Sequence, residues 1–254
     1  MLNIWGMTDI GLVRNENQDA YGVRFNEETD HWICVVCDGM GGTRGGQVAS
    51  KLASETFLSS CAANLQRDMT ANEVQKVASF AVSSANNAVY ERAKDDQQLH
   101  GMGTTLVSAI VWREGALLNN VGDSRAYLIR CTGLVEEGEA RIARITRDHS
   151  LVERLIELGD ITPEEARNHP NRNLITRALG PDASTESDTY FVHLQKGDAI
   201  LLCTDGLIDT VLEEEMEREI LSAGDEHGCL NRLLDIAKSR GASDNVTAVL
   251  LRQC

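Results

Sequence analysis

The chain has 254 residues, of which 42% are hydrophobic, and a formal net charge of −15. That length and apolar content allow a substantial buried core. The acidic balance argues against nucleic acid or an anionic membrane as a partner, because such binding needs a basic surface. No apolar run of 18 residues and no basic, apolar leader is visible, so we expect a protein that is neither membrane-spanning nor exported.

Seven cysteines, an odd number, stand mostly in apolar contexts. This usage is typical of a reducing compartment and predicts a cytoplasmic protein. Cys34 and Cys37 form a C-x-x-C, but they lie in a strand-like run, where residues three apart point to opposite faces. No second C-x-x-C completes a zinc site. We therefore expect both cysteines to pack in the core.

Strand-like stretches rich in Val, Ile, Leu and Tyr occur along most of the chain. They cover residues 31–37, 103–112, 115–121, 126–130, 141–146, 189–194, 198–203 and 245–251. The second and third stretches are joined through Arg113-Glu114-Gly115 and predict a hairpin, which requires antiparallel neighbours.

Helical periodicity is clearest from 71 to 94, where Val and Ala recur at spacings of three and four. Further helices are expected at 47–60, 151–158, 212–223 and 230–238. Gly159 is placed to cap the helix at 151–158. Thr162-Pro163-Glu164-Glu165 combines an N-cap, a first-turn proline and a capping-box glutamate, so a short helix should begin there.

Antiparallel strands with helices grouped between them predict an α+β fold rather than an alternating parallel sheet. We expect two packed antiparallel sheets with helices outside. Only three prolines occur and no linker interrupts the pattern, so residues 1–254 are expected to form a single domain. The acidic run at 213–217 is expected to be a solvated helix face.

Four aspartates stand at the ends of apolar runs, each beside glycine or another turn-forming residue: Asp38, Asp123, Asp205 and Asp244. Two like charges about 4 Å apart cost roughly 4 kcal/mol at an effective dielectric near 20. Converging aspartates would therefore need a bound cation. Ligands that are all oxygen select hard ions, which predicts Mg²⁺ or Mn²⁺. Taken singly, each aspartate could equally be a turn or cap residue.

Nine motifs occur in order along nearly the whole chain. They are TDIGLVR at 8–14 with NQD at 17–19, DGMGG at 38–42, GMGTT at 101–105, GDSRAY at 122–127, DHS at 148–150, ITPEEA at 161–166, HPNRNLITRALG at 169–180, TDGL at 204–207 and SDN at 243–245. On these motifs the chain resembles bacterial members of the metal-dependent type 2C protein Ser/Thr phosphatases, the PPM family.

The resemblance implies a sandwich of two antiparallel β-sheets flanked by helix pairs on both sides. It also implies a metal site with two central ions and a probable third, weaker ion. Asp38 would bridge the central ions. The other implied ligands are the Gly39 carbonyl, Asp205 and Asp244 for the central ions, Asp123 with Asp205 for the third, and Asp19 for a metal-bound water.

The implied reaction is hydrolysis of phosphoserine and phosphothreonine monoesters by a water or hydroxide that bridges the ions. Arg14 would bind two phosphate oxygens with its planar fork. The segment at about 150–177 corresponds to the mobile flap of bacterial relatives, and we expect it to shape phosphoprotein selection. The substrates would be phosphorylated Ser/Thr proteins, and one partner a cognate Ser/Thr kinase whose signalling the enzyme reverses. A monomer is the default expectation.

The chain departs from its relatives beside DGMGG. Animal relatives have a histidine at the place of Met40, and many bacterial relatives have one at the place of Thr43. We hypothesise that metal-bound water, or a histidine from elsewhere such as His149 or His169, protonates the leaving alkoxide. For these two histidines a structural role and a turn role, respectively, are the favoured interpretations.

The sequence argues against three rival interpretations. A P-loop is excluded because no lysine follows the glycines at 39–42 at the required spacing. A serine esterase built on Gly122-Asp123-Ser124 lacks a later Asp-x-x-His. A catalytically silent regulator that binds phosphoproteins would be expected to have lost metal ligands, and all four aspartates are present.

Overall fold

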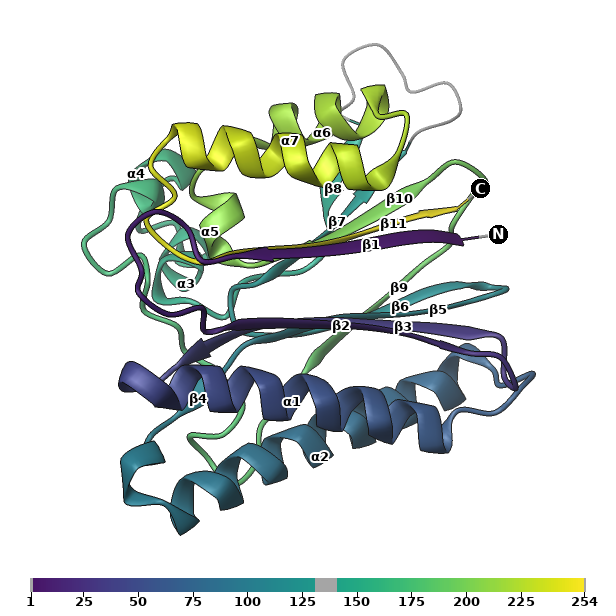
Figure 1. The fold of residues 1–254 in the computed structure, drawn as a ribbon, viewed down its shortest axis with the longest axis horizontal. Coiled ribbons are helices and arrows are strands. Elements are labelled where there is room, and N and C mark those ends of the chain that lie inside the picture. The colour runs from purple at the N-terminus through teal and green to yellow at the C-terminus, as the bar shows by residue number, and fades with distance from the viewer. Residues whose placement is uncertain (1, 131–140, 254) are drawn as a thin grey trace.

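The computed structural model describes residues 2–130 and 141–253. Two antiparallel sheets pack face to face in the centre, and helices cover both outer faces (Figure 1). This is the α+β sandwich that the strand pattern and the resemblance predicted.

The first sheet joins both ends of the chain. Its strand order is β1 (Leu2–Asp9), β11 (Val246–Gln253), β10 (Ala199–Cys203), β7 (Arg125–Ile129) and β8 (Ile142–Arg144). β1 pairs with β11 along its whole length, from Leu2 opposite Gln253 to Asp9 opposite Val246. Loops that are far apart in the sequence therefore emerge side by side at one end of this sheet.

The second sheet is built from the middle of the chain. Its order is β2 (Asp19–Asn26), β3 (His31–Met40), β5 (Leu106–Trp112), β6 (Gly115–Val121) and β9 (Asp188–Val192), and the short β4 (Gly103–Thr104) pairs with the end of β3. β5 and β6 form the predicted hairpin, with Trp112 opposite Gly115.

Helix pairs lie on the two outer faces (Figure 1). The elements are α1 (Gly42–Asn64) and α2 (Ala71–Asp95) on the second sheet, α6 (Glu213–Ser222) and α7 (Glu226–Ser239) on the first, α3 (Leu151–Leu158), α4 (Pro163–Arg167) and α5 (Asp205–Ile208) at one end, and a 3-10 turn at Gln97–Leu99. None of the helices in the described part of the chain is long and apolar enough to cross a membrane.

The helix-capping predictions are confirmed. Gly159 ends α3 in the left-handed conformation, with φ of 75°. Thr162 accepts a hydrogen bond from the Glu165 amide, and the Glu165 side chain accepts one from the Thr162 amide. Both motifs satisfy backbone groups that a helix end would otherwise leave unpaired.

Three hydrophobic clusters fill the layers: one under α1 and α2, one under α5, α6 and α7, and one between the sheets. β3 serves two of them because its side chains alternate. Cys37 packs toward α1, and Cys34 packs between the sheets. The C-x-x-C therefore splits across two faces, as predicted.

Several elements differ from the sequence prediction. β1 and β2 were not predicted, because these edge strands are half exposed and contain Gly6 and Gly22. The predicted strand at 103–112 is divided at Thr105 into β4 and β5. α1 begins at Gly42 rather than 47, α5 was missed, and α7 begins at Glu226 rather than 230. In each helix, glycine or polar residues in the first turn conceal the start.

Candidate active site

The loops that carry the predicted site residues converge on a cavity of about 600 Å³. Its wall contains the end of β3, loops that adjoin strands of both sheets, and residues near both ends of the chain. Among them are Arg14, Asp38, Gly39, Asp123, Asp205 and Asp244, together with Met40, Thr105, Asn173, Ile175 and Asn245. The structure thus brings six of the seven predicted site residues together, and the seventh, Asp19, lies behind the wall.

Asp38 is fixed by two adjacent threonines near the end of β3. Its amide donates to Thr105 Oγ1 at 2.9 Å, and its carbonyl accepts from Thr104 Oγ1 at 2.8 Å. Asp19 stands opposite Asp38 in the pairing of β2 with β3. The GMGTT motif was visible in the sequence, but no structural role was predicted for these two threonines.

Asp19 is a buried carboxyl group held from the other sheet. Thr204 Oγ1 donates to Asp19 Oδ2 at 2.9 Å. Burial raises the pKa of Asp19 to about 7, against the opposing effect of hydrogen bonds from Thr247 and Thr204. Asp19 therefore lies beside Asp38 without lining the cavity itself.

The acidic groups of the wall raise one another's pKa values. Burial, and then the charges of Asp19 and Asp205, raise the pKa of Asp38 well above its ordinary value. Burial and the charge of Asp205 raise the pKa of Asp123 to about 8. For Asp205 itself, burial and the charge of Asp244 raise the pKa to about 6. A bound cation would stabilise the ionised forms of all of these groups.

Asp205 has a buried carboxylate oxygen without a partner. The residue begins α5 shortly after the end of β10, and its Oδ1 is buried without a hydrogen bond. Within residues 2–130 and 141–253, no three histidine, cysteine or carboxylate side chains are already arranged to hold a metal ion. The aspartate side chains nevertheless fit a hard divalent cation, because they offer carboxylate oxygens and Asp205 Oδ1 has no hydrogen-bond partner.

Arg14 and Asp244 meet at the mouth of the cavity. Arg14 Nη2 donates to Asp244 Oδ2 at 2.6 Å, and the two side chains are 54% and 34% exposed. This hydrogen bond is the main cause that raises the pKa of Arg14. The guanidinium is therefore partly exposed to solvent at the edge of the cavity.

Asn245 ties the Arg14 loop to the strand that follows Asp244. Its Oδ1 accepts from the Gln18 amide at 2.8 Å, and its Nδ2 donates to the carbonyls of Ile10 and Glu16. The SDN motif was recognised in the sequence, but no role was predicted for this asparagine. Its signal was only its place between Asp244 and an apolar strand.

Gly39 allows α1 to begin directly against β3. A Cβ on Gly39 would lie 2.0 Å from the carbonyl oxygen of Gly46, which no side chain can tolerate. The glycine-rich start of α1 is thus a close packing of two backbones beside Asp38.

No histidine lines this cavity among the described residues. His149 is 8% exposed and bonded to Gly122, and His169 Nδ1 accepts from the Asn171 amide in a turn. Both have the structural roles favoured from the sequence. Met40 lines the cavity, whereas the side chain of Thr43 lies outside the described part of the structure.

The segment at 150–177 covers one side of the site. Asn173 and Ile175 line the catalytic cavity. α3 has no fully buried residue, because its apolar stripe faces a second cavity of about 550 Å³ under α3 and α4. The two cavities share Asp123, Asp205 and Asn173.

Comparison with known proteins decides the family. The family described as Protein phosphatase 2C matches residues 13–235, a span that includes Arg14, Asp38, Asp123 and Asp205. The chain belongs to the protein phosphatase 2C family.

Curated relatives in this family carry names that state their activity. The serine/threonine phosphatase stp of Listeria monocytogenes is 37% identical over 246 residues, which cover 97% of this chain and 94% of that protein. The protein phosphatase PhpP of Streptococcus pneumoniae is 34% identical over 96% of this chain and 95% of its own length. The solved structure of the serine/threonine phosphatase Stp1 from Staphylococcus aureus has a TM-score of 0.89 and 35% identity, and the match covers 99% of this chain and 95% of that one.

This protein phosphatase 2C is accordingly a protein Ser/Thr phosphatase, and phosphoproteins are its substrates. Membership of the family implies dependence on divalent metal ions, Mn²⁺ or Mg²⁺. A catalytically silent regulator is not favoured, since the named relatives at this similarity are phosphatases.

Proposed function

We propose that the carboxylates of the catalytic cavity hold two central divalent ions and a third, weaker one. Asp38, Asp205, Asp244 and the Gly39 carbonyl would hold the central pair, and Asp123 with Asp205 the third. The observation that carries this proposal is the gathering of four aspartates around one cavity, with the Oδ1 of Asp205 buried and unpaired.

Bound ions would lower the pKa of a coordinated water, which would then be the nucleophile for monoester hydrolysis, and would neutralise charge on the phosphate. Arg14 would bind two oxygens of the phosphate at the cavity mouth and orient the phosphorus for attack. Asp19, buried behind the wall and hydrogen bonded to Thr204, would orient groups around Asp38.

We propose that solvent, rather than a histidine, protonates the leaving alkoxide. The support is that the wall of the cavity contains no histidine among the described residues, while His149 and His169 are engaged elsewhere. The pH dependence of turnover on a phosphoserine peptide tests this. An acid limb that disappears when one histidine is replaced would contradict it.

Release of phosphate from a phosphothreonine peptide tests the proposed metal site. With Mn²⁺ we expect turnover in the wild type and in Asp95→Ala, an exposed control on α2, and none in Asp38→Ala or with a chelator. Full activity of Asp38→Ala at saturating Mn²⁺ would contradict the proposed ligand set.

We further propose that residues 1–254 act as one domain, with the segment at about 150–177 as a flap beside the cavity. Asn173 and Ile175 in the cavity wall support a role for it in substrate contact. Cytoplasmic location, a monomeric state and reversal of a cognate Ser/Thr kinase are proposed alongside. The five free, buried cysteines among the described residues support a reducing compartment.

A further inference from the structure

Residues 146–150 form a segment, buried except for Arg147, that lines no part of the catalytic cavity. Thr146, Asp148, His149 and Ser150 are each at most 8% exposed. Seven of the nine sequence motifs supply residues to that cavity, whereas the DHS motif within this segment supplies none and has no assigned task. Its hydrogen bonds indicate one.

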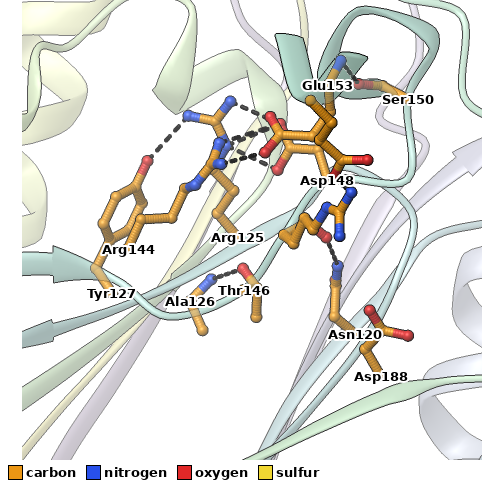
Figure 2. Close-up of polar contacts among 12 residues, drawn as sticks. Asn120, Arg125, Ala126, Tyr127, Arg144, Thr146, Asp148, Ser150, Glu153 and Asp188 are labelled. Carbon is orange, nitrogen blue, oxygen red and sulfur yellow. Dashed lines mark hydrogen bonds and ion pairs between the residues drawn. The ribbon is translucent and has the colours of Figure 1, made fainter. Parts of the chain in front are cut away.

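On one side the segment holds the loop that carries Asp123. The Ala126 amide donates to Thr146 Oγ1 at 2.9 Å, and Asn120 Nδ2 donates to the Arg147 carbonyl at 2.8 Å. Figure 2 shows the contact between Ala126 and Thr146. In the same view Arg125 faces Asp148, and its Nε donates to Oδ1 at 2.9 Å. These hydrogen bonds hold the chain in place on both sides of Asp123.

On the other side the segment holds both ends of the flap. Ser150 caps α3 and forms an isolated β-bridge with Ile175. The Thr176 amide donates to the His149 carbonyl at 2.7 Å, and the Leu151 amide donates to the Leu174 carbonyl at 2.9 Å. One short segment therefore connects the Asp123 loop with the residues that enter and leave the flap.

His149 makes the contact nearest to Asp123. Its amide donates to the Gly122 carbonyl at 2.9 Å, and its ring Nδ1 accepts from the Gly122 amide at 3.1 Å. Gly122 has φ of +104°, and a Cβ there would lie 2.6 Å from the Thr105 side chain. Both backbone polar groups of Gly122, directly before Asp123, thus bond to His149, and the carbonyl also accepts from Asn120 Nδ2 at 3.1 Å.

The ring of His149 is held in one tautomer by its surroundings. Because Nδ1 accepts a hydrogen bond, the proton of the neutral ring lies on Nε2. Nε2 faces Asp188 Oδ2 at 3.3 Å and also lies 3.1 Å from Arg177 Nη1, which donates to the other oxygen of Asp188 at 3.0 Å. The two ring nitrogens therefore serve different neighbours, which permits a test that separates them.

We propose that His149 is a positioning residue whose Nδ1 fixes the Gly122 turn and thereby holds Asp123 in place for cation binding. The inference rests on the proposed function, in which Asp123 holds the weaker ion. His149 does not touch the substrate; it acts through the backbone that carries a ligand.

Asparagine and glutamine substitutions separate the two nitrogens. The Oδ1 of asparagine can replace Nδ1 as acceptor for the Gly122 amide, whereas the amide of glutamine reaches only the place of Nε2. Titration calorimetry with Mn²⁺ should show the weak binding event nearly unchanged in His149→Asn. In His149→Gln that event should weaken by roughly three- to tenfold, as expected for one lost hydrogen bond, while the tight events stay unchanged.

A second readout does not depend on metal. Hydrogen exchange of peptides covering 120–126 in the chelated protein should be faster in His149→Gln than in His149→Asn. Equal exchange and equal Mn²⁺ affinity in the two variants would overturn the proposal. A loss in His149→Asn with retention in His149→Gln would overturn it too, because the contact with Asp188 would then be the one that matters.

Asp123→Ala distinguishes this failure from failure of the proposed function. If Asp123→Ala leaves every Mn²⁺ binding event unchanged, the assignment of Asp123 is wrong and the inference falls with it. If Asp123→Ala removes the weak event but His149→Gln does not affect it, only the positioning role is wrong. The double variant Asp123→Ala/His149→Gln should match Asp123→Ala.

Discussion

Arg14 and Asp244 are bound to one another across the cavity mouth, at 2.6 Å between Nη2 and Oδ2. An incoming phosphate would offer Arg14 a doubly charged partner with two oxygens in line with its fork. More than half of the Arg14 side chain is exposed, so the guanidinium can exchange one partner for the other. We therefore expect the pair to receive the substrate phosphate and to contribute little to stability.

Replacement of Arg14 by alanine should raise KM for a phosphothreonine peptide by about tenfold or more. A hydrogen bond to a charged group contributes roughly 1.5–3 kcal/mol, and each 1.4 kcal/mol is a factor of ten. Arg14→Lys should recover only part of the loss, because lysine lacks the planar fork. Steady-state kinetics checks this, with the exposed Arg113→Ala as control; an unchanged KM for Arg14→Ala would contradict the assignment.

At the scale of elements, the helix α2 offers a test of local stability that should not affect catalysis. Thr70 caps α2, and its side chain and that of Glu73 form a capping box. We expect Thr70→Ala to lower the free energy of unfolding by about 1 kcal/mol. Thr70→Ser keeps the hydroxyl and should match the wild type. Urea unfolding measures the loss, and a change in peptide turnover would show that α2 reaches the site.

The flap segment at 150–177 should govern which phosphoproteins are dephosphorylated fastest. It places Asn173 and Ile175 in the cavity wall, and residues of its helices α3 and α4 line the adjoining second cavity. Exchange of this segment for that of the Listeria relative should change the rank order of kcat/KM across a phosphopeptide panel. Turnover of p-nitrophenyl phosphate, which has no peptide to contact the flap, should change little. An unchanged rank order would argue against the flap.

Elements with strong local signals could be predicted from the sequence, and those without could not. α3 was found with its bounds because its apolar stripe and the Gly159 stop agree, and the structure adds a Ser150 cap. β1 was missed because an edge strand needs no continuous apolar run, and Gly6 leaves room for the Tyr21 ring rather than adding a side chain. Its identity as a strand comes from pairing with β11, at the other end of the chain.

At the scale of the whole molecule, the pairing of first and last strands determines what meets at the cavity. Asp38 and Asp205 were recognisable in the sequence because each follows an apolar run beside glycine. Asn245 and Thr105 were not, because their tasks are hydrogen bonds to loops more than 60 residues away. Such partners depend on which strands pair and on how the two sheets face each other, which no local pattern contains.

The metal-free protein should lose stability as the pH rises above 6.5. Burial raises the folded-state pKa of Asp19 to about 7 and of Asp123 to about 8, far above the ordinary value near 3.9. The folded state therefore holds protons that the unfolded state has released, and stability falls until those protons leave. Histidines with lowered pKa values, such as His31 and His149, are neutral in both states over most of this range.

Urea unfolding in chelator at pH 6.5, 7.5 and 8.5 checks this decline. Asp123→Asn should flatten its upper part, since one titrating group is gone, and Mn²⁺ should reduce the slope in the wild type because the cation stabilises the ionised forms. A stability that rises from pH 6.5 to 8.5 in chelator would contradict the account of the buried carboxyl groups.

The central claim is that distant acidic side chains converge to bind divalent cations. A crystal soaked in Mn²⁺, with diffraction recorded at the manganese absorption edge, tests it most directly. We predict anomalous peaks in contact with Asp38, Asp205 and Asp244 within the catalytic cavity. A saturated crystal whose anomalous map shows no peak beside Asp38 and Asp205 would contradict the account.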